Sequence, residues 1–257
     1  KQTITLNGCG PVKLNAGESG YYRTLYADAA FAPLLGAYEG MEAADQIGLL
    51  NDAYALAATG YAKFPRFLDL AARTPAGADP LIIESIAGRF AALNRYYDDM
   101  PGQAKFQAFA RNWMSQAFAN VGWDGKAGES DNYKSMRTTL IGALSELGDS
   151  KVIAEARKRY AAFERNPASL DPELVKTVVA IVAANADQAQ FDRMLAKART
   201  AKSPVEQRLY YQSLAAVKNK AVAAKAIDAF LAPETNPQLA PRLFRALSGQ
   251  HPKLVWD

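Results

Sequence analysis

The sequence predicts a mostly α-helical protein, an α-α superhelix of antiparallel helix pairs preceded by a short β segment. From about residue 33 onward the apolar residues recur at helical spacing, and capping residues followed by proline mark several helix starts. Residues 1–27 instead alternate apolar and polar side chains around turn-forming residues. With 257 residues, of which 49% are hydrophobic, the chain is long enough to bury a sizeable core.

The β segment is predicted from three short runs. Residues 3–6 alternate, residues 7–11 supply turn chemistry and residues 12–14 alternate again, which together indicate a hairpin. A third strand is expected at residues 20–26, which are rich in aromatic and β-branched side chains. Three strands this short make a poor sheet on their own.

The helices are predicted from their ends. A capping residue followed by proline at the first helical position begins four of them, at Asp79, Asp171, Ser203 and Asn236. Glycine ends several others, at Gly60, Gly122 and Gly148, because glycine adopts the left-handed backbone conformation at little steric cost. The predicted helices cover residues 39–59, 64–73, 80–98, 101–121, 131–147, 150–165, 172–186, 188–201, 204–218, 220–231 and 237–248.

The spacing of the helix starts indicates a repeat. From residue 131 onward two successive helices occupy about 32 to 41 residues, the length of the helical hairpins that HEAT and armadillo repeats stack. Short connections make neighbouring helices antiparallel, and stacked hairpins build an array with a concave face. The repeat is inferred from this rhythm, because the sequence identity between the units is low.

Composition excludes several classes of function. Lys and Arg number 30 against 26 Asp and Glu, and both signs are interleaved, which argues against a nucleic-acid partner. One cysteine, Cys9, and one histidine, His251, cannot make a structural zinc site, so no cofactor is expected in this fragment. The longest strongly apolar stretch, residues 174–186, is too short to cross a bilayer, so no membrane span is expected.

The first residues carry neither an initiator methionine nor a signal peptide, which predicts that the chain begins inside a larger protein. Alanine-rich helices and a single cysteine are typical of a bacterial protein. The compartment, cytoplasmic or periplasmic, is not predicted by the sequence.

No residue is predicted to be catalytic. Nucleophilic hydrolysis needs a base beside the nucleophile, and the only histidine, His251, is expected at the surface or at a helix end. Asp45 and Asp52 are seven residues apart on one helix face, where capping and hydrogen bonding between helices explain them.

Arginine occurs together with aromatic or apolar residues at three places, and two interpretations remain open. The tyrosines can be anchors buried in the core, or the groups can bind peptide carboxylates and backbone oxygens. The candidate substrate contacts are Arg95, Tyr96, Tyr97, Arg208, Tyr210, Tyr211, Arg242 and Arg245.

Four motifs follow one another along nearly the whole chain. The first is Gly20-Tyr21-Tyr22-Arg23 within residues 15–26, and the second is a helix with Asp45 and Asp52 within residues 45–57. The third is Val121-Gly122-Trp123 followed by Glu129 and Arg137, and the fourth is the closing stretch 236–257. In this order they resemble the C-terminal helical domain of gluzincin zinc aminopeptidases, of the aminopeptidase N and puromycin-sensitive type.

The resemblance implies that residues 1–27 are the trailing strands of a β-sandwich domain and that residues 28–257 are the helical-repeat C-terminal domain. Gln46 stands where the family usually has Arg, and residues 236–238 depart from the family pattern, so no role is carried over there. The family's His-Glu-x-x-His helix, further zinc-ligand Glu and catalytic Tyr would lie upstream of Lys1. Zinc is thus implied for the parent enzyme only, with no catalytic or metal-binding residue in this chain.

Three hypotheses for function follow. The leading one is a non-catalytic domain that caps the active site of a zinc-dependent aminopeptidase and controls peptide access, with its own upstream catalytic domain and peptide substrates as partners. The alternative is a free-standing helical-repeat scaffold that binds a protein in its concave face. The third, a basic surface for nucleic acid, requires binding that weakens steeply with salt.

Overall fold

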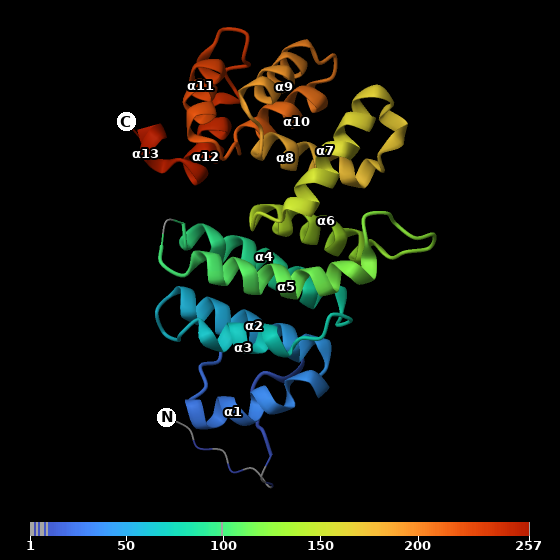
Figure 1. Cartoon of the computed structure of the whole chain (residues 1–257). Helices are drawn as coiled ribbons and strands as arrows, with labels where there is room; N and C mark the ends of the chain where they lie inside the picture. Colours follow the sequence, from blue (N-terminus) through green and yellow to red (C-terminus); the bar gives the residue numbers. More distant parts are fainter. Residues whose placement is uncertain (1–2, 4, 6–7, 9, 99, 257) are drawn as a thin grey trace. The chain divides into compact units, whose positions relative to one another are not determined.

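The computed structural model describes residues 3, 5, 8, 10–98 and 100–256 (Figure 1). These residues contain helices and no strand, which confirms the mostly α-helical prediction. The chain divides into two compact units, Lys1–Leu140 and Ile141–Asp257, each with its own internal packing.

Unit 1 contains α1 to α5, and α6 crosses into unit 2. The helices are α1 (Asp28–Ala37), α2 (Ala43–Ala58), α3 (Pro65–Arg73), α4 (Pro80–Tyr96), α5 (Gln103–Val121) and α6 (Asp131–Glu146). In Figure 1, α2 pairs with α3 and α4 pairs with α5, and α2 also packs on α4. Each pair is a helical hairpin, although the repeat was predicted only from residue 131 onward.

An aromatic cluster forms the centre of the unit 1 core. Phe90 on α4 is fully buried and makes edge-to-face contacts with Phe67 of α3 at 6.0 Å and with Trp113 of α5 at 5.6 Å between ring centroids. Such edge-to-face contacts stabilise the core beyond what the burial of the large apolar rings contributes. Trp113 also donates its Nε1 hydrogen to the Thr74 carbonyl at 3.3 Å, so this polar atom is satisfied inside the core.

Unit 2 repeats the hairpin arrangement. Its helices after α6 are α7 (Ser150–Arg165), α8 (Pro172–Ala184), α9 (Gln188–Thr200), α10 (Pro204–Leu214), α11 (Lys220–Leu231), α12 (Ala240–Gln250) and α13 (Pro252–Trp256). α7 packs on α8, α9 and α8 both pack on α10, and α11 packs on α12. Figure 1 shows these pairs side by side within the unit.

Three of the four predicted N-caps form at the helix starts that the sequence predicts. The carboxylates of Asp79 and Asp171 and the hydroxyl of Ser203 each accept a hydrogen bond from the backbone N–H two residues later, at 2.8, 2.9 and 3.3 Å. Asn236 also accepts one, from Gln238, but α12 begins only at Ala240. Every predicted helix is present, with ends displaced by four residues at most.

Two short helices were not predicted. α1 carries Pro33 in its interior, and a proline there removes a backbone donor and usually ends a helix. α13 is a single short segment that begins with Pro252. Their patterns are too short or too interrupted for helical periodicity to show.

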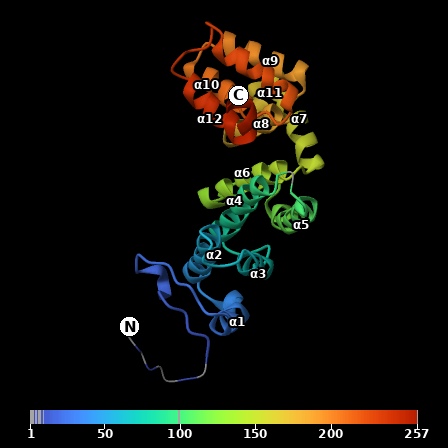
Figure 2. The same cartoon turned by 90° about the vertical axis from the view of Figure 1, so that its left-hand side faces the viewer.

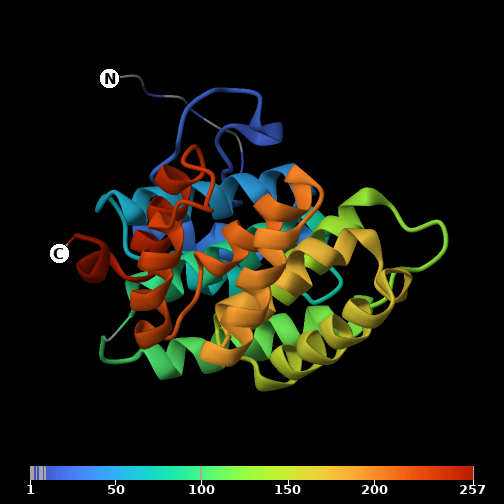
Figure 3. The ribbon, with the colours of Figure 1, turned by 90° about the horizontal axis from the view of Figure 1, so that it is seen from above.

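The predicted β segment is wrong for the residues that the structure describes between 10 and 27. They contain one 3-10 turn, η1 (Ala16–Glu18), and otherwise irregular backbone that runs along the outside of its own unit (Figures 2 and 3). A strand requires a neighbouring backbone to complete its ladder. Here side chains take that place, because the Leu14 N–H donates to the Tyr26 hydroxyl at 2.9 Å. Positions 4, 6, 7 and 9 of the expected hairpin lie outside the described residues, and a separate domain at residues 1–27 stays a prediction.

Candidate functional site

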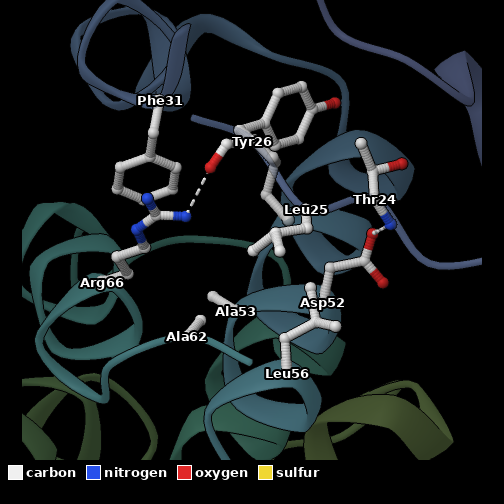
Figure 4. Close-up of a pocket in the computed structure, with 10 residues that line it drawn as sticks. Thr24, Leu25, Tyr26, Phe31, Asp52, Ala53, Leu56, Ala62 and Arg66 are labelled. Atoms are coloured by element: carbon white, nitrogen blue, oxygen red, sulfur yellow. Dashed lines mark hydrogen bonds between the residues drawn. The ribbon is translucent and has the colours of Figure 1, made fainter. Parts of the chain in front are cut away.

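The N-terminal segment, residues 10–27, is fastened to α2 through Asp52. This carboxylate is 8% exposed and accepts hydrogen bonds from the Thr24 N–H at 2.8 Å and from Arg23 Nη1 at 3.1 Å. Figure 4 shows the Thr24 contact. A buried carboxylate that accepts a backbone and a guanidinium hydrogen bond is well satisfied, so Asp52 has a structural role.

Asp45 fastens the same segment two turns earlier on α2. It accepts a hydrogen bond from the Gly17 N–H at 2.8 Å and lies 3.5 Å from Lys13 Nζ, which itself contacts Glu18 at 2.6 Å. Burial lowers the pKa of Lys13, but the hydrogen bond and charge of Glu18 and the charge of Asp45 outweigh it and raise that pKa overall. The Glu18 carboxylate lies directly over Gly48, where a side chain would collide with it.

A small pocket lies between the segment and the helices (Figure 4). Arg66 of α3 closes it, donating from Nη1 to the Tyr26 carbonyl at 2.7 Å and stacking over the Phe31 ring at 5.0 Å from its centroid. The other lining residues include Leu25, Leu49 and Leu56. The space holds about one water molecule, so we regard it as a packing seam.

A more open hollow adjoins it, lined by Glu18, Gly20, Tyr21, Tyr22, Arg23, Asn51 and Asp52. Behind Asn51 lies Arg89 of α4, which donates hydrogen bonds to the Asn51 side chain and to the backbone and hydroxyl of Ser85. Its guanidinium lies 5.0 Å from the centroid of the Tyr54 ring. Burial lowers the pKa of Arg89, Tyr54 acts in the opposite sense, and the nearby charge of Arg23 lowers it further.

Arg89 was not among the residues singled out in the sequence, although a signal was present. Ile82, Ile86 and Leu93 are buried on α4, and position 89 continues their four-three-four spacing. A charged residue in line with a buried stripe is unusual. That irregularity marks Arg89 as a residue that needs a chemical explanation.

Glu129 and Arg137 form a buried ion pair between the loop after α5 and α6. Arg137 donates through both terminal nitrogens to the two carboxylate oxygens, with Nη1 to Oε2 at 2.6 Å, and through Nε to the Gly122 carbonyl at 3.2 Å. The hydrogen bond from Arg137 lowers the pKa of Glu129, and the Arg137 charge adds to it against the effect of burial. The pair closes the loop between α5 and α6.

The eight candidate contact residues are not equivalent in the structure. Arg95, Arg208, Arg242 and Arg245 are exposed, as is Tyr96. Tyr97 stacks on Phe106 with centroids 5.4 Å apart. Tyr210 and Tyr211 are buried in unit 2, and the Tyr211 hydroxyl accepts a 3.3 Å hydrogen bond from Thr235. A contact with substrate stays a prediction for this set.

In unit 2 a hollow lies where the N-termini of α7, α9 and α11 meet. Lys218 donates to the carbonyls of Ser145 and Glu146 at 3.3 and 3.2 Å, and lies 3.1 Å from the Glu146 carboxylate. Arg157 donates to the Asn185 carbonyl at 2.8 Å. These cations hold the ends of helices together, which is a structural use of their charge.

His251 lies at the C-terminal end of α12, as expected, with Nε2 2.8 Å from the Val217 carbonyl oxygen. Among the residues described, no three His, Cys, Asp or Glu side chains gather where they could hold a metal ion. None of the described helices combines the length and the apolar character needed to cross a bilayer.

Comparison with known proteins identifies the family to which this architecture belongs. The ERAP1-like C-terminal domain family matches residues 11–257. The chain is 26% identical to Aminopeptidase M1-A of Oryza sativa subsp. japonica, covering 95% of this chain and 29% of that protein. It is 23% identical to Aminopeptidase 2 of Candida albicans, covering 86% and 23%, and 25% identical to the puromycin-sensitive aminopeptidase of Caenorhabditis elegans, covering 76% and 21%.

The chain thus spans less than a third of the length of these relatives. Their sources are a plant, a yeast and a nematode, which gives the expectation of a bacterial source no support. The match begins at residue 11 and so includes most of the N-terminal segment together with the helices. The chain belongs to the ERAP1-like C-terminal domain family and is a C-terminal domain of the M1 aminopeptidase type.

Proposed function

We propose that this chain is the non-catalytic C-terminal domain of a zinc-dependent aminopeptidase, which caps the active site and controls which peptides reach it. The family match over residues 11–257 carries this proposal. The relatives are named aminopeptidases and are more than three times as long as the region they share with this chain. The rest of such a protein would be the partner of this domain, and peptides would be its substrates.

The zinc and the catalytic groups would come from that other part. The chain holds one histidine, and its side chain is engaged with the Val217 carbonyl. The described residues do not fit a zinc ion, because they offer no cluster of three ligands. This domain would act on the reaction through shape, by excluding water and folded proteins from a chamber and admitting flexible peptides.

One assay tests the non-catalytic part of the proposal. The purified 257-residue chain is incubated with an aminoacyl fluorogenic substrate and zinc, and we expect no hydrolysis that scales with the concentration of the chain. Hydrolysis that scales with it, and persists after a second purification, would contradict the proposal.

A second assay tests the control of access in the longer aminopeptidase that contains this domain. Arg95 and Tyr96 are exposed on α4, and the variants R95A and Y96A are compared with R73A, an exposed control on α3. We expect R95A or Y96A to change kcat/KM for a nonapeptide by about threefold or more and to leave a dipeptide substrate unchanged. Equal effects on both substrates, or none on either, would contradict access control through this helix end.

A further inference from the structure

The N-terminal segment, residues 10–27, exposes many large apolar side chains on the outside of unit 1 (Figure 2). Among the described residues, five of the fourteen exposed large apolar side chains lie on this short stretch. This exposed row consists of Val12, Leu14, Tyr21, Tyr22 and Leu25. Single exposed apolar residues are common on protein surfaces, but a row of five in one segment indicates a surface that another part of a protein covers.

The side that the segment turns toward its own helices is largely polar. The Lys13 side chain is only 11% exposed, and its Nζ lies 2.6 Å from Glu18 and 3.5 Å from Asp45 of α2. Further along, the Thr24 N–H donates to the buried carboxylate of Asp52 at 2.8 Å. A segment that only covered its own helices would bury apolar side chains and expose charged ones, so the polarity of this segment is inverted.

The residue types in and beside the exposed row are typical of a protein interface. Tyr21 and Tyr22 offer large rigid rings with a hydroxyl group each, and Arg23, 54% exposed, lies between them and the helices. Tyrosine and arginine are enriched at the centres of interfaces. Because Asp52 already pairs with Arg23, the surface that fits is mostly apolar, with hydrogen-bond acceptors for the tyrosine hydroxyls.

The rest of the longer protein is the occupant that the observations favour. The relatives are more than three times as long as the region they share with this chain, and the matching family describes a C-terminal domain. Under the proposed function, most of the protein therefore precedes this chain and joins it close in sequence to Val12. A covalently attached partner has a high effective concentration at such a surface. The family match begins at residue 11, so the segment belongs to the domain together with the helices.

We propose that the exposed row is the surface against which the preceding part of the longer protein packs. Asp45 and Asp52 hold the polar side of the segment on α2, which leaves its apolar side chains available to that partner. The segment then joins two parts of the protein through its two sides. This inference rests on the proposed function for the existence of the preceding part, and it names the side chains that contact that part.

The test is hydroxyl-radical labelling read by mass spectrometry, applied to the 257-residue chain and to the longer protein that contains it. Trypsin cuts after Lys13 and Arg23, which releases residues 14–23 with three members of the exposed row. The matched control is the tryptic peptide 127–134, which carries Tyr133, 43% exposed on α6.

We expect residues 14–23 to be oxidised about fivefold more slowly in the longer protein than in the chain alone, because side chains at the centre of an interface are shielded from solvent. The control peptide should change by less than about twofold, since Tyr133 lies outside the exposed row. Equal oxidation of residues 14–23 in both proteins, or an equal loss in both peptides, would overturn the proposal. Protection in the chain alone that rises with its concentration would identify a second copy as the occupant and would overturn it too.

A double variant gives a second measurement. Y21S/Y22S should leave the midpoint of thermal unfolding of the chain alone unchanged, because both side chains are exposed there, and should lower it in the longer protein. Y133S is the control and should leave both midpoints unchanged. A double variant that behaves like Y133S in the longer protein would contradict the proposal.

The labelling of the wild-type proteins gives its answer even if the double variant fails to fold. Neither measurement uses hydrolysis. Failure of this surface is therefore distinct from failure of the proposed function, which the kinetic assays measure.

Discussion

Arg137 holds both carboxylate oxygens of Glu129 in a pair whose side chains are 4% and 7% exposed. The same guanidinium donates to the Gly122 carbonyl and so joins the end of α5, the following loop and α6. A charge buried this deeply depends on its partner, because water cannot replace it. The first two predictions follow from that dependence.

Removing the charge of Glu129 should strongly destabilise unit 1. E129Q leaves the Arg137 guanidinium buried and unneutralised, and we expect a loss of about 3 to 5 kcal/mol in the free energy of unfolding. Urea unfolding followed by circular dichroism measures it. D131N serves as the control, because Asp131 is exposed and pairs with Lys134 at the surface, where an ion pair contributes little to stability. A loss as small as that of D131N would show that the pair contributes little.

The same pair should make stability depend on pH in the acid range. The pKa of Glu129 is lower in the folded state than its usual 4.5, so its contribution is fully present above about pH 4.5 and is lost as the pH falls through the folded-state pKa. Unfolding of wild type and E129Q is compared from pH 7 to pH 3. The difference between them should shrink as the pH falls, and a constant difference would refute the assignment.

Asp52 should control how fast backbone amides of the N-terminal segment exchange their hydrogens with solvent. In D52A the Thr24 N–H and the Arg23 guanidinium both lose their acceptor, and we expect a loss of about 1 to 3 kcal/mol with faster hydrogen exchange at Thr24. Hydrogen exchange followed by NMR reports the site directly. D69A, at an exposed position of α3, is the control and should leave the exchange at Thr24 unchanged.

Gly48 should be required for the position of Glu18. A methyl group at position 48 would collide with the Glu18 carboxylate, so G48A should displace it and speed exchange at the Gly17 amide, which lies next to Glu18 and bonds Asp45. G88A, on α4, has open space around the new methyl group and should stabilise its helix by about 0.5 to 1 kcal/mol. If G48A stabilised the chain as G88A does, with no change at Gly17, the contact would be unimportant.

Phe90 should contribute more to the stability of the unit 1 core than its neighbour Phe109. Phe90 is fully buried at the centre of the aromatic cluster, so F90A should cost about 3 to 5 kcal/mol. Phe109 contacts the same ring but is 38% exposed, and F109A should cost clearly less. Chemical unfolding of both variants tests the order.

The helices could be predicted because their signals are local. A proline after a capping Asp or Ser fixes a helix start within a few residues, as at Asp79 and Asp171, whatever the rest of the chain does. The segment at residues 20–26 failed for the opposite reason. Its aromatic and β-branched residues suit a strand, but a strand also needs a neighbour, and here Asp52, almost thirty residues away, takes the backbone hydrogen bond instead.

The candidate site shows the same limit. The sequence directed attention to adjacent Arg and Tyr residues, and of these Tyr210 and Tyr211 lie in the core. Arg89 and Asn51 are 38 positions apart, and their hydrogen bond forms only once α2 and α4 have packed. The local sequence pattern shows that Arg89 interrupts a buried apolar stripe on α4. It does not show which groups surround Arg89 in the fold.

The placement of the tryptophans gives the chain a built-in optical label. Trp113 lies against Phe90 in dry surroundings, with its indole nitrogen engaged by Thr74, whereas Trp256 is 91% exposed. A buried indole emits at shorter wavelength than a hydrated one, and iodide ions reach only the latter. The blue edge of the emission therefore follows Trp113 in the interior of unit 1, and the red edge, which iodide quenches, follows Trp256 in the last helix, while the half-buried Trp123 beside Phe118 contributes between them.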